Sequence, residues 1–503
     1  MVKDMIVAAA AVAAAAMAPL AATVKPILTH INDNSMAISW GYLNPNDSLP
    51  SSLRSRVRYG FAANNLTETV TSTPTMMTSP TENMTGYDYC GHDYEHHILH
   101  HVQLKNLPTP ETIYYCADEI ASSSKLETCG SFKTSTPSSS AELRFYATAD
   151  VGDPVSHSWT AIPQMSKQCQ VDDLYPIDVS LGFHVGDIAY NLDIPQRGDD
   201  YIAGVSSNMG SQFPWMFAPG NHEADCNYTY QNYKGRFAAQ NFTSATHGVP
   251  SKSSRWYSFD KGPVHFVAID TDAWGFDEVA YILKQQYDWL TQDLEAVDKS
   301  ITPWVVLMGH RPMYCSSASA IVQSHLGWPK QHDDMPKGTP APDNYGDEFR
   351  KHGFHPPSWS ELELLSSDND GDNNYPCGIA DLLRNGMIHA DGSGDRSYGL
   401  ETLMQQYQVN VYLTGHEHNY ERTWPIMNGT QVNSYDQPGK PVHIVTGSGG
   451  AYGKDPFGPV APFDAYRSSD WSYSDIFVNN SHFILNQRLA NDSSVIDTMV
   501  LTR

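Results

Sequence analysis

The sequence lacks the short motifs that mark several common enzyme chemistries. It has no G-x-S-x-G turn for a serine hydrolase, no G-x-x-x-x-G-K-[ST] loop for a nucleotide phosphate, and no G-x-G-x-x-G after a strand for a dinucleotide. Its seven cysteines form no C-x-x-C pair, which argues against a thiolate metal site. The chemistry of this chain must therefore rest on other side chains.

Basic residues are also scarce. The chain has 31 Lys and Arg against 56 Asp and Glu, which gives a formal net charge of -25. Such a charge repels nucleic acids and anionic membrane surfaces, so we expect neither as the main partner of this chain. After the first 22 residues, no apolar run is long enough to span a bilayer.

Residues 1–22 have the pattern of a secretory signal peptide, because Lys3 precedes an almost unbroken apolar run and small residues follow it. An alanine-rich helix and an uncleaved membrane anchor are the alternatives. Secretion is also favoured by the cysteine content and by eight N-x-[ST] sequons. These sequons begin at Asn46, Asn65, Asn83, Asn227, Asn241, Asn428, Asn479 and Asn491. We expect a secreted glycoprotein with disulfides, extracellular or vacuolar-lysosomal, with no stable membrane insertion after signal cleavage.

The length of 503 residues predicts more than one domain. Residues 24–136 contain β-branched and aromatic runs separated by turn residues, which predicts an all-β sandwich. These runs are MAISWGY, SRVRYG, HHILHHVQL, TIYYCAD and CGSFKT. We expect an exposed loop over the Ser-, Thr- and Met-rich residues 69–86, and a bridge between Cys116 and Cys129 is feasible. The linker-like TSTPSSSA places the next domain at 141–503.

The second domain repeats one format, a buried apolar strand followed by a turn that carries polar residues. The segments are LRFYATAD, VSLGFHVGD, PWMFAPGNHE, VHFVAIDTD, PWVVLMGHRP, VNVYLTGHEH and VHIVTGSGG. A period near 3.6 predicts a helix over about 277–297. Residues 316–396 predict an insertion, either a functional lid or a surface excursion. Within it, DNDGDNN (368–374) predicts a solvated acidic turn, because its glycine is misplaced for a calcium loop.

The polar residues at these strand ends supply the donors of a metal site. In GHEH, the i, i+2 spacing sends both imidazoles to one side of an extended segment while Glu417 points away. Carboxylates, a phenol, an amide and imidazoles together suit a pair of ions such as Fe, Zn or Mn. The Asp187 carboxylate, with two oxygens, is the natural bridge between two ions. The candidate ligands are Asp150, Asp187, Tyr190, Asn221, His310, His416 and His418.

With these motifs in this order, the sequence resembles a purple acid phosphatase, a secreted calcineurin-like binuclear metallophosphoesterase. GHEHNYERTWP, GHRPMYC and PVHIVTGSGG are close to the wording of that family. The resemblance covers nearly the whole chain. It implies an α/β (α+β) fold, a four-layer metallophosphatase β-sandwich flanked by helices. An all-β, fibronectin-III-like sandwich domain, as in the large family members, would precede it.

The resemblance also implies the cofactors, Fe(3+) and one divalent ion (Zn, Fe or Mn). Asp187 would bridge the two ions, and a Tyr190 tyrosinate on iron would give the purple colour. The iron ligands would be Asp150, Tyr190 and His418, and those of the divalent ion Asn221, His310 and His416.

The sequence departs from the family at two places. Ala149 stands where the family usually has glycine. The region after His310 also lacks the histidines with which the plant enzymes bind substrate phosphate. The candidates that could replace them are His325, His332, His352 and His355, and none can be assigned.

The expected function is an acid phosphatase that hydrolyses phosphate monoesters, with hydroxide from a metal-held water as nucleophile and His222 as general acid. Glu223 is expected to cap or orient its neighbours. Arg422 could contact phosphate or form a buried ion pair. The alternatives are a phosphodiesterase of the same superfamily and an inactive secreted metal-binding or storage glycoprotein. A homo-oligomer is compatible with the sequence.

Overall fold

The structure is a computed structural model of the chain. The residues that it describes are 25–82, 90–120, 127–134, 142–154, 159–169, 179–194, 196–225, 229–243, 248–275, 281–317, 379–451 and 453–503.

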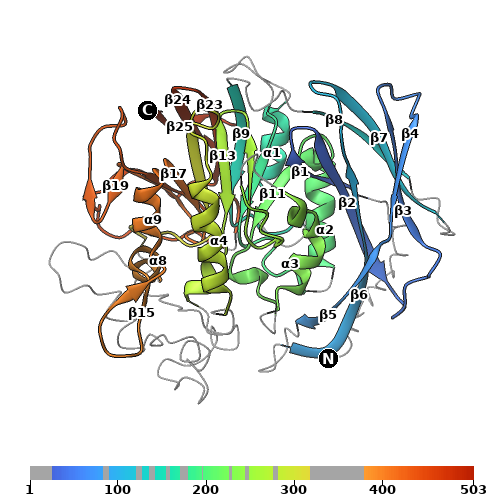
Figure 1. The fold of residues 1–503 in the computed structure, drawn as a ribbon, viewed down its shortest axis with the longest axis horizontal. Coiled ribbons are helices and arrows are strands. Elements are labelled where there is room, and N and C mark those ends of the chain that lie inside the picture. The colour runs from blue at the N-terminus through green and yellow to red at the C-terminus, as the bar shows by residue number, and fades with distance from the viewer. Residues whose placement is uncertain are drawn as a thin grey trace, which may run out of the picture.

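The N-terminal strands form two four-stranded antiparallel sheets (Figure 1). Apolar side chains from both sheets, such as Ile38, Val57 and Ile113, pack into one core, as the sequence predicts for a sandwich. Cys116 and Cys129 are opposite each other on neighbouring strands and form the expected disulfide. One sheet has the order β1 (Ile27–Asn32), β2 (Ser35–Asn44), β6 (Cys90–Leu104), β5 (Thr75–Glu82); the other has β4 (Glu68–Ser72), β3 (Arg54–Gly60), β7 (Thr112–Ile120), β8 (Thr128–Lys133). The likeness to fibronectin III stays a prediction.

The prediction of an exposed loop over 69–86 is wrong, because β4 and β5 cover most of that segment. Both strands lie at the edge of their sheets, β4 against β3 and β5 against β6. An edge strand has one unpaired side, so Ser and Thr suit it better than a central strand. Thr69, Val70 and Thr71 are β-branched residues that favour a strand.

Two larger sheets of mixed direction form the second part of the chain and pack face to face. Phe145 of one sheet and Phe266 of the other meet edge to face, with ring centroids 5.2 Å apart, within a core built from both. The first sheet has the order β11 (Trp215–Ala218), β10 (Gly182–Val185), β9 (Glu142–Thr148), β23 (Ser472–Asn479), β24 (His482–Leu489), β25 (Val495–Thr502). The second has β12 (Tyr257–Lys261), β13 (Val264–Ala268), β14 (Trp304–Met308), β17 (Val411–Thr414), β21 (Val442–Thr446), β18 (Tyr420–Thr423), β22 (Asp464–Ser468). The seven predicted strands are all present.

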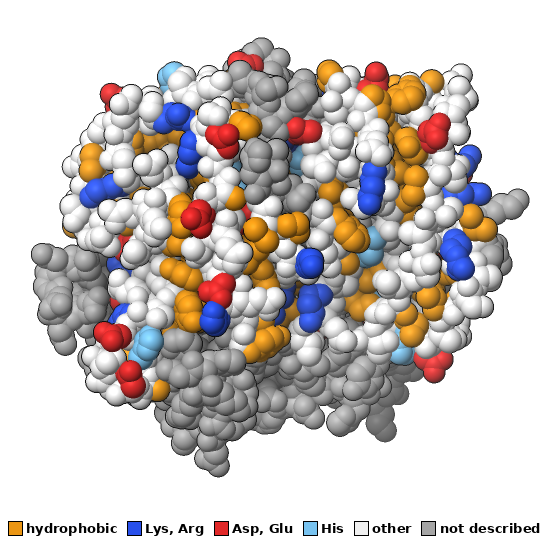
Figure 2. Space-filling view, in the orientation of Figure 1, with side chains coloured by type: hydrophobic (Ala, Val, Ile, Leu, Met, Phe, Trp, Pro, Cys, Tyr) orange, Lys and Arg blue, Asp and Glu red, His pale blue; other side chains and the backbone are white. Residues whose placement is uncertain are grey.

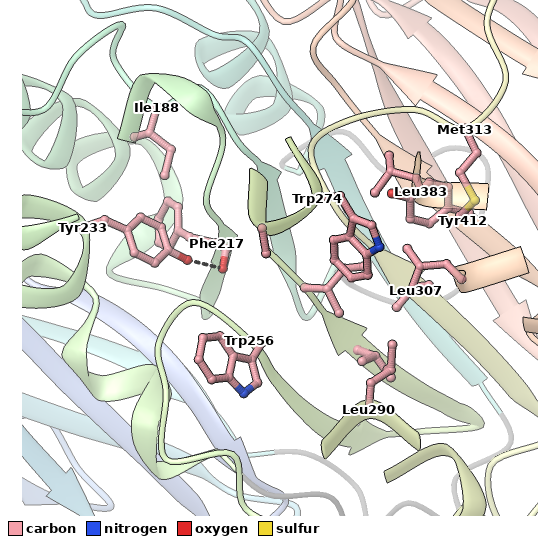
Figure 3. Close-up of a cluster of buried hydrophobic side chains, with 14 of the residues drawn as sticks. Ile188, Phe217, Tyr233, Trp256, Trp274, Leu290, Leu307, Met313, Leu383 and Tyr412 are labelled. Atoms are coloured by element: carbon pink, nitrogen blue, oxygen red, sulfur yellow. Dashed lines mark hydrogen bonds between the residues drawn. The ribbon is translucent and has the colours of Figure 1, made fainter. Parts of the chain in front are cut away.

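Short helices flank these sheets (Figure 1). The predicted helix over about 277–297 is α4, Leu283–Glu295; residues 276–280 lie outside the described ranges. Figure 3 shows Leu290 of α4 near Leu307 and Trp274, in the core that joins the helices to the second sheet. The other α-helices are α1 (Ala161–Gln168), α2 (Arg197–Val205), α3 (Gln231–Arg236), α8 (Ala380–Asn385) and α9 (Leu400–Gln406). Shorter helical segments are η1 (Ser206–Gly210), η2 (Asn221–Glu223), η3 (Ala238–Phe242) and η4 (Thr271–Trp274).

Several predictions concern residues outside the described ranges. These include the signal peptide, the linker at 135–140 and DNDGDNN. The four histidines of the insertion named above also lie outside. The described end of the insertion, residues 379–396, holds α8 and the small pair β15 (Met387–Ile388) and β16 (Arg396–Ser397); a second small pair is β19 (Ile426–Met427) and β20 (Thr430–Gln431).

On the face drawn in Figure 2, the acidic and basic side chains of the described residues are scattered among polar and apolar ones. Among the residues that the structure describes, no helix combines the length and the apolar character needed to cross a membrane.

Candidate metal centre

The predicted ligands gather because they follow strands of both sheets at the same end. Asp150 and Asp187 come two residues after β9 and β10, and Asn221 comes three after β11. His310 and His416 come two residues after β14 and β17 of the other sheet. The strands β9, β10 and β11 run parallel, as do β14 and β17, so their carboxyl ends bring these side chains together.

The turns that present these ligands hold an uncommon backbone conformation. Asp150, Asp187, Tyr190 and His416 have φ values of 57°, 54°, 48° and 73°. Left-handed backbone costs of the order of 1–3 kcal/mol for a residue with a side chain, and such residues concentrate at functional sites. Orienting these four side chains therefore lowers the stability of the fold.

One half of the site consists of Asp187, His310 and His416, whose ligand atoms all lie within 4.8 Å of one another. His310 Nε2 is 3.1 Å from Asp187 Oδ1. The other ring nitrogen, Nδ1, lies 3.0 Å from the Val185 carbonyl oxygen and donates to it, so Nε2 keeps its lone pair for the cluster. The buried Asn221 Oδ1 has no hydrogen-bond partner among the described residues, as expected of an oxygen that faces a cation.

The other half consists of Asp150, Tyr190 and His418. The Tyr190 hydroxyl lies 3.0 Å from Asp150 Oδ1 and 2.7 Å from His418 Nε2. His418 Nε2 is 3.7 Å from Asp150 Oδ1. A carboxylate, a phenol and an imidazole therefore converge with their donor atoms toward one point, which is the arrangement that a single ion requires.

The electrostatics of the site favour a bound cation. Burial raises the pKa of Asp150 well above its usual value, and the nearby Asp187 adds to the effect. Burial and the same two carboxylates raise the pKa of Tyr190. Burial lowers the pKa of His310, but the nearby Asp187 outweighs this effect, and the pKa rises to about 10. Buried acids packed this closely need positive charge beside them, which metal ions supply.

The replacement of the family glycine by Ala149 is accommodated locally. Ala149 is fully buried, and a Cβ on Gly415 would lie 2.4 Å from the Ala149 Cβ and 2.5 Å from Asp150 Oδ2. Glycine at 415 therefore leaves room for the methyl group of Ala149 and for the ligand carboxylate. Asp150 keeps its contacts with Tyr190 and His418 beside this methyl group.

Glu223 is a support for the site, as expected. Its buried carboxylate accepts hydrogen bonds from the backbone N–H groups of Asp187, Ile188 and Gly220 at 2.8, 2.6 and 2.8 Å. These bonds fix the turn after β10 against the turn after β11. Asp187 and Asn221 are thereby held at a set separation.

Of the two options for Arg422, the structure shows the buried ion pair. Its Nε and NH2 donate to the two carboxylate oxygens of Asp497 at 2.7 and 2.8 Å. Asp497 lies on β25, and the Tyr420 hydroxyl also donates to it. Arg422 therefore joins the two large sheets and has a structural role.

His222 lies at the rim of the site with its side chain 28% exposed, which leaves it accessible to a substrate. Its Nε2 is 3.7 Å from Asp187 Oδ2. Its Nδ1 lies 2.6 Å from Asn191 Oδ1, which can only accept, so Nδ1 carries a proton. The nitrogen that faces the site is therefore Nε2, which can donate a proton to a leaving group when the ring is an imidazolium, with both nitrogens protonated.

Sequence reasoning missed three residues that the structure places at the site. Asn191 orients His222, and Asp455 Oδ2 accepts the backbone N–H of His418 at 2.7 Å. Arg311 NH1 lies 3.0 Å from His416 Nε2. Asn191 and Arg311 are direct neighbours of predicted ligands, which was an available signal. Asp455 is 37 residues from His418 and gave none.

These residues fit a pair of metal ions, since the donor set is mixed, buried and convergent, and one amide oxygen lacks a partner within the described chain. With the two-sheet fold, they define the class of the protein as a metallophosphoesterase. A calcineurin-like phosphoesterase model matches residues 143–420, and an iron/zinc purple acid phosphatase-like C-terminal model matches residues 440–498. The chain belongs to the calcineurin-like phosphoesterase family, as the resemblance implies.

Similar proteins carry phosphatase names. A zebrafish (Danio rerio) "Acid phosphatase type 7" is 28% identical over 95% of this chain and 91% of its own length. A "Probable inactive purple acid phosphatase 9" of Arabidopsis thaliana is 27% identical over 64% of this chain and 43% of its own. A purple acid phosphatase from yellow lupin (Lupinus luteus) seeds has a similar fold, with a TM-score of 0.64, 19% identity, and coverage of 95% of this chain and 74% of that one.

Proposed function

We propose that this protein is a secreted acid phosphatase that hydrolyses phosphate monoesters with a binuclear Fe(III)–M(II) centre. The observation that carries the proposal is the convergence of Asp187, His310 and His416, with ligand atoms within 4.8 Å, beside the Asp150–Tyr190–His418 group. When bound, the two ions supply a nucleophilic water of lowered pKa and positive charge for the phosphoryl oxygens.

The residues of the chain have distinct roles in this proposal. Asp150, Tyr190 and His418 would hold Fe(3+), and the Asp187 carboxylate would bind both ions. The other ligands, Asn221, His310 and His416, would hold the divalent ion, Zn, Fe or Mn. His222 protonates the leaving alkoxide through Nε2, with Asn191 fixing its ring. The centre is cationic within a chain of charge -25, so it attracts a phosphate that the rest of the surface repels.

Secretion is part of the proposal and has three supports. The first 22 residues have the composition of a signal peptide. Cys116 and Cys129 form a disulfide, which suits an oxidising compartment. Four of the sequons lie on exposed asparagines, where a glycan could be attached: Asn46, Asn65, Asn428 and Asn491.

The proposal is tested by comparing turnover of p-nitrophenyl phosphate and bis(p-nitrophenyl) phosphate at acidic pH, with metal analysis of the same sample. We expect about two metal ions per chain and faster monoester turnover. Faster turnover of the diester would assign the protein to the phosphodiesterases instead. A third outcome, metal binding without activity, is also worth testing, because one relative is named a probable inactive phosphatase. Full metal content with no turnover of either ester would identify a metal-binding glycoprotein.

The role of His222 predicts an effect that depends on the leaving group. His222→Ala should keep both metals and lose roughly 10²- to 10⁴-fold in kcat on alkyl phosphates, because general acid catalysis is worth that much. On p-nitrophenyl phosphate the loss should be small, since that leaving group needs no proton. His482→Ala, on β24, is the matched control and should change neither rate. An equal loss on both esters would contradict the assignment.

A further inference from the structure

The structure places the guanidinium of Arg311 against the side chain of a predicted metal ligand, His416. Its NH1 lies 3.0 Å from His416 Nε2. The residue is 2% exposed and follows His310 directly in the chain. The proposed metal ligands do not include Arg311. A cationic side chain beside a cluster of cation-binding residues therefore needs an explanation.

The stem of Arg311 is fixed at three points. Its backbone N–H donates to Thr271 Oγ1 at 3.1 Å, and its carbonyl oxygen accepts from the Tyr412 hydroxyl at 2.8 Å. Its Nε donates to Asp272 Oδ1 at 2.8 Å. Asp272 is itself held, because its Oδ2 accepts from the Tyr230 hydroxyl at 2.9 Å. The guanidinium therefore has a set position and only a small range of movement.

The contact between Arg311 and His416 is incompatible with metal binding by His416. A neutral imidazole, the form that binds a metal ion, has one lone pair. If Nε2 binds the ion, its lone pair is used. If Nδ1 binds the ion, Nε2 carries a proton and cannot accept. In both cases the NH1 hydrogen bond to Nε2 is lost.

An arginine beside two cations is destabilised unless an anion lies between them. The substrate of the proposed reaction provides that anion. A guanidinium donates well to phosphate oxygens, and one whose Nε is already bound to Asp272 loses little side-chain entropy on contact. In the sequence, the region directly after His310 lacks the histidines with which the plant enzymes bind substrate phosphate.

We propose that Arg311 is the phosphate-binding residue of this site, and that its NH1 turns from His416 to a phosphoryl oxygen when the metal ions are bound. The inference rests on the proposed function. It concerns how the phosphoryl group is held, whichever ester carries it.

The test is isothermal titration of the metal-loaded protein with inorganic phosphate, together with metal analysis, for wild type, Arg311→Gln and Arg311→Lys. We expect full metal content in all three, with phosphate affinity reduced at least about tenfold in Arg311→Gln and less in Arg311→Lys. KM for monoesters should rise in parallel.

Arg255→Gln is the matched control. Arg255 is also buried and donates to a carboxylate of the same turn, Asp270, but contacts no predicted ligand. It should lower thermal stability and leave phosphate affinity unchanged.

The outcomes separate this inference from the proposed function. Wild-type phosphate affinity in both Arg311 variants overturns the inference, as does metal loss in Arg311→Gln, which would assign Arg311 to orienting His416. If Arg311→Gln does not fold, wild-type affinity in Arg311→Lys alone overturns it. Wild type that binds phosphate and hydrolyses no ester defeats the proposed function only. Wild type that binds no phosphate defeats both.

Discussion

Asp187→Asn is expected to lose more than about 100-fold in phosphatase rate and to keep at most one metal ion per chain. Replacing a residue that merely supports a metal ligand costs about 10- to 100-fold in affinity or activity, so loss of the bridging carboxylate should exceed that. Asparagine has nearly the same shape, but it has one acceptor oxygen and no charge.

The surroundings of Asp187 explain why charge, and not shape, matters there. Although burial acts in the opposite direction, His310 and His222 hold the pKa of Asp187 well below its usual value. Its Oδ1 also accepts the His222 backbone N–H at 3.1 Å, which an asparagine oxygen can do as well. The turn should therefore survive the change while the bridge between the ions is lost.

Asp187→Asn is measured by metal analysis and by monoester turnover of the purified protein. Asp497→Asn is the matched control, because Asp497 is a buried carboxylate bound to Arg422 away from the ligands. It should lower the free energy of unfolding and leave metal content unchanged. Two ions and a wild-type rate in Asp187→Asn would refute the bridging role.

Tyr190→Phe is expected to abolish visible absorption while preserving the fold. The colour implied by the family resemblance requires a tyrosinate on ferric iron, and the variant lacks only the phenol oxygen. The ring keeps its packing against His222 and His418, whose ring centroids lie 4.7 and 5.6 Å away. Burial, Asp150 and Asp187 all raise the pKa of Tyr190, so a cation is needed to ionise the phenol.

The measurement is a visible spectrum with metal analysis of wild type and variant. We expect a purple wild type that contains iron, and a colourless variant with weaker iron binding. Tyr314→Phe is a suitable control, since Tyr314 is also buried but donates to Glu401. A colourless, iron-free wild type would overturn the ferric assignment and leave a metallophosphatase with other metals.

The strand ends were predictable because each carries its own local signal. Runs such as Trp304–Met308 are apolar throughout, as a strand buried on both faces must be, and a polar turn follows. His310 and His416 could be named as ligands from their place in these turns. The amphipathic period of α4 was equally local.

The predictions that were wrong or left open concern residues whose structure depends on contacts with distant parts of the chain. The sequence of β4 and β5 is polar, and only pairing with β3 and β6 makes these segments strands. Arg422 gave two options, since its partner Asp497 is 75 residues away. Such choices are set by the free energy of long-range contacts, which a local pattern does not contain.

The sequence by itself determined the class of the protein and its candidate ligands, because residue type and spacing at strand ends carry that chemistry. Only the tertiary structure decided which side chains support them. The pairing of β9 with β23, more than 300 residues apart, builds the sheet that carries Asp150 and Asp187. Packing brings Arg311 onto His416 and Asn191 onto His222. These contacts depend on distance in space, which the order of residues does not reveal.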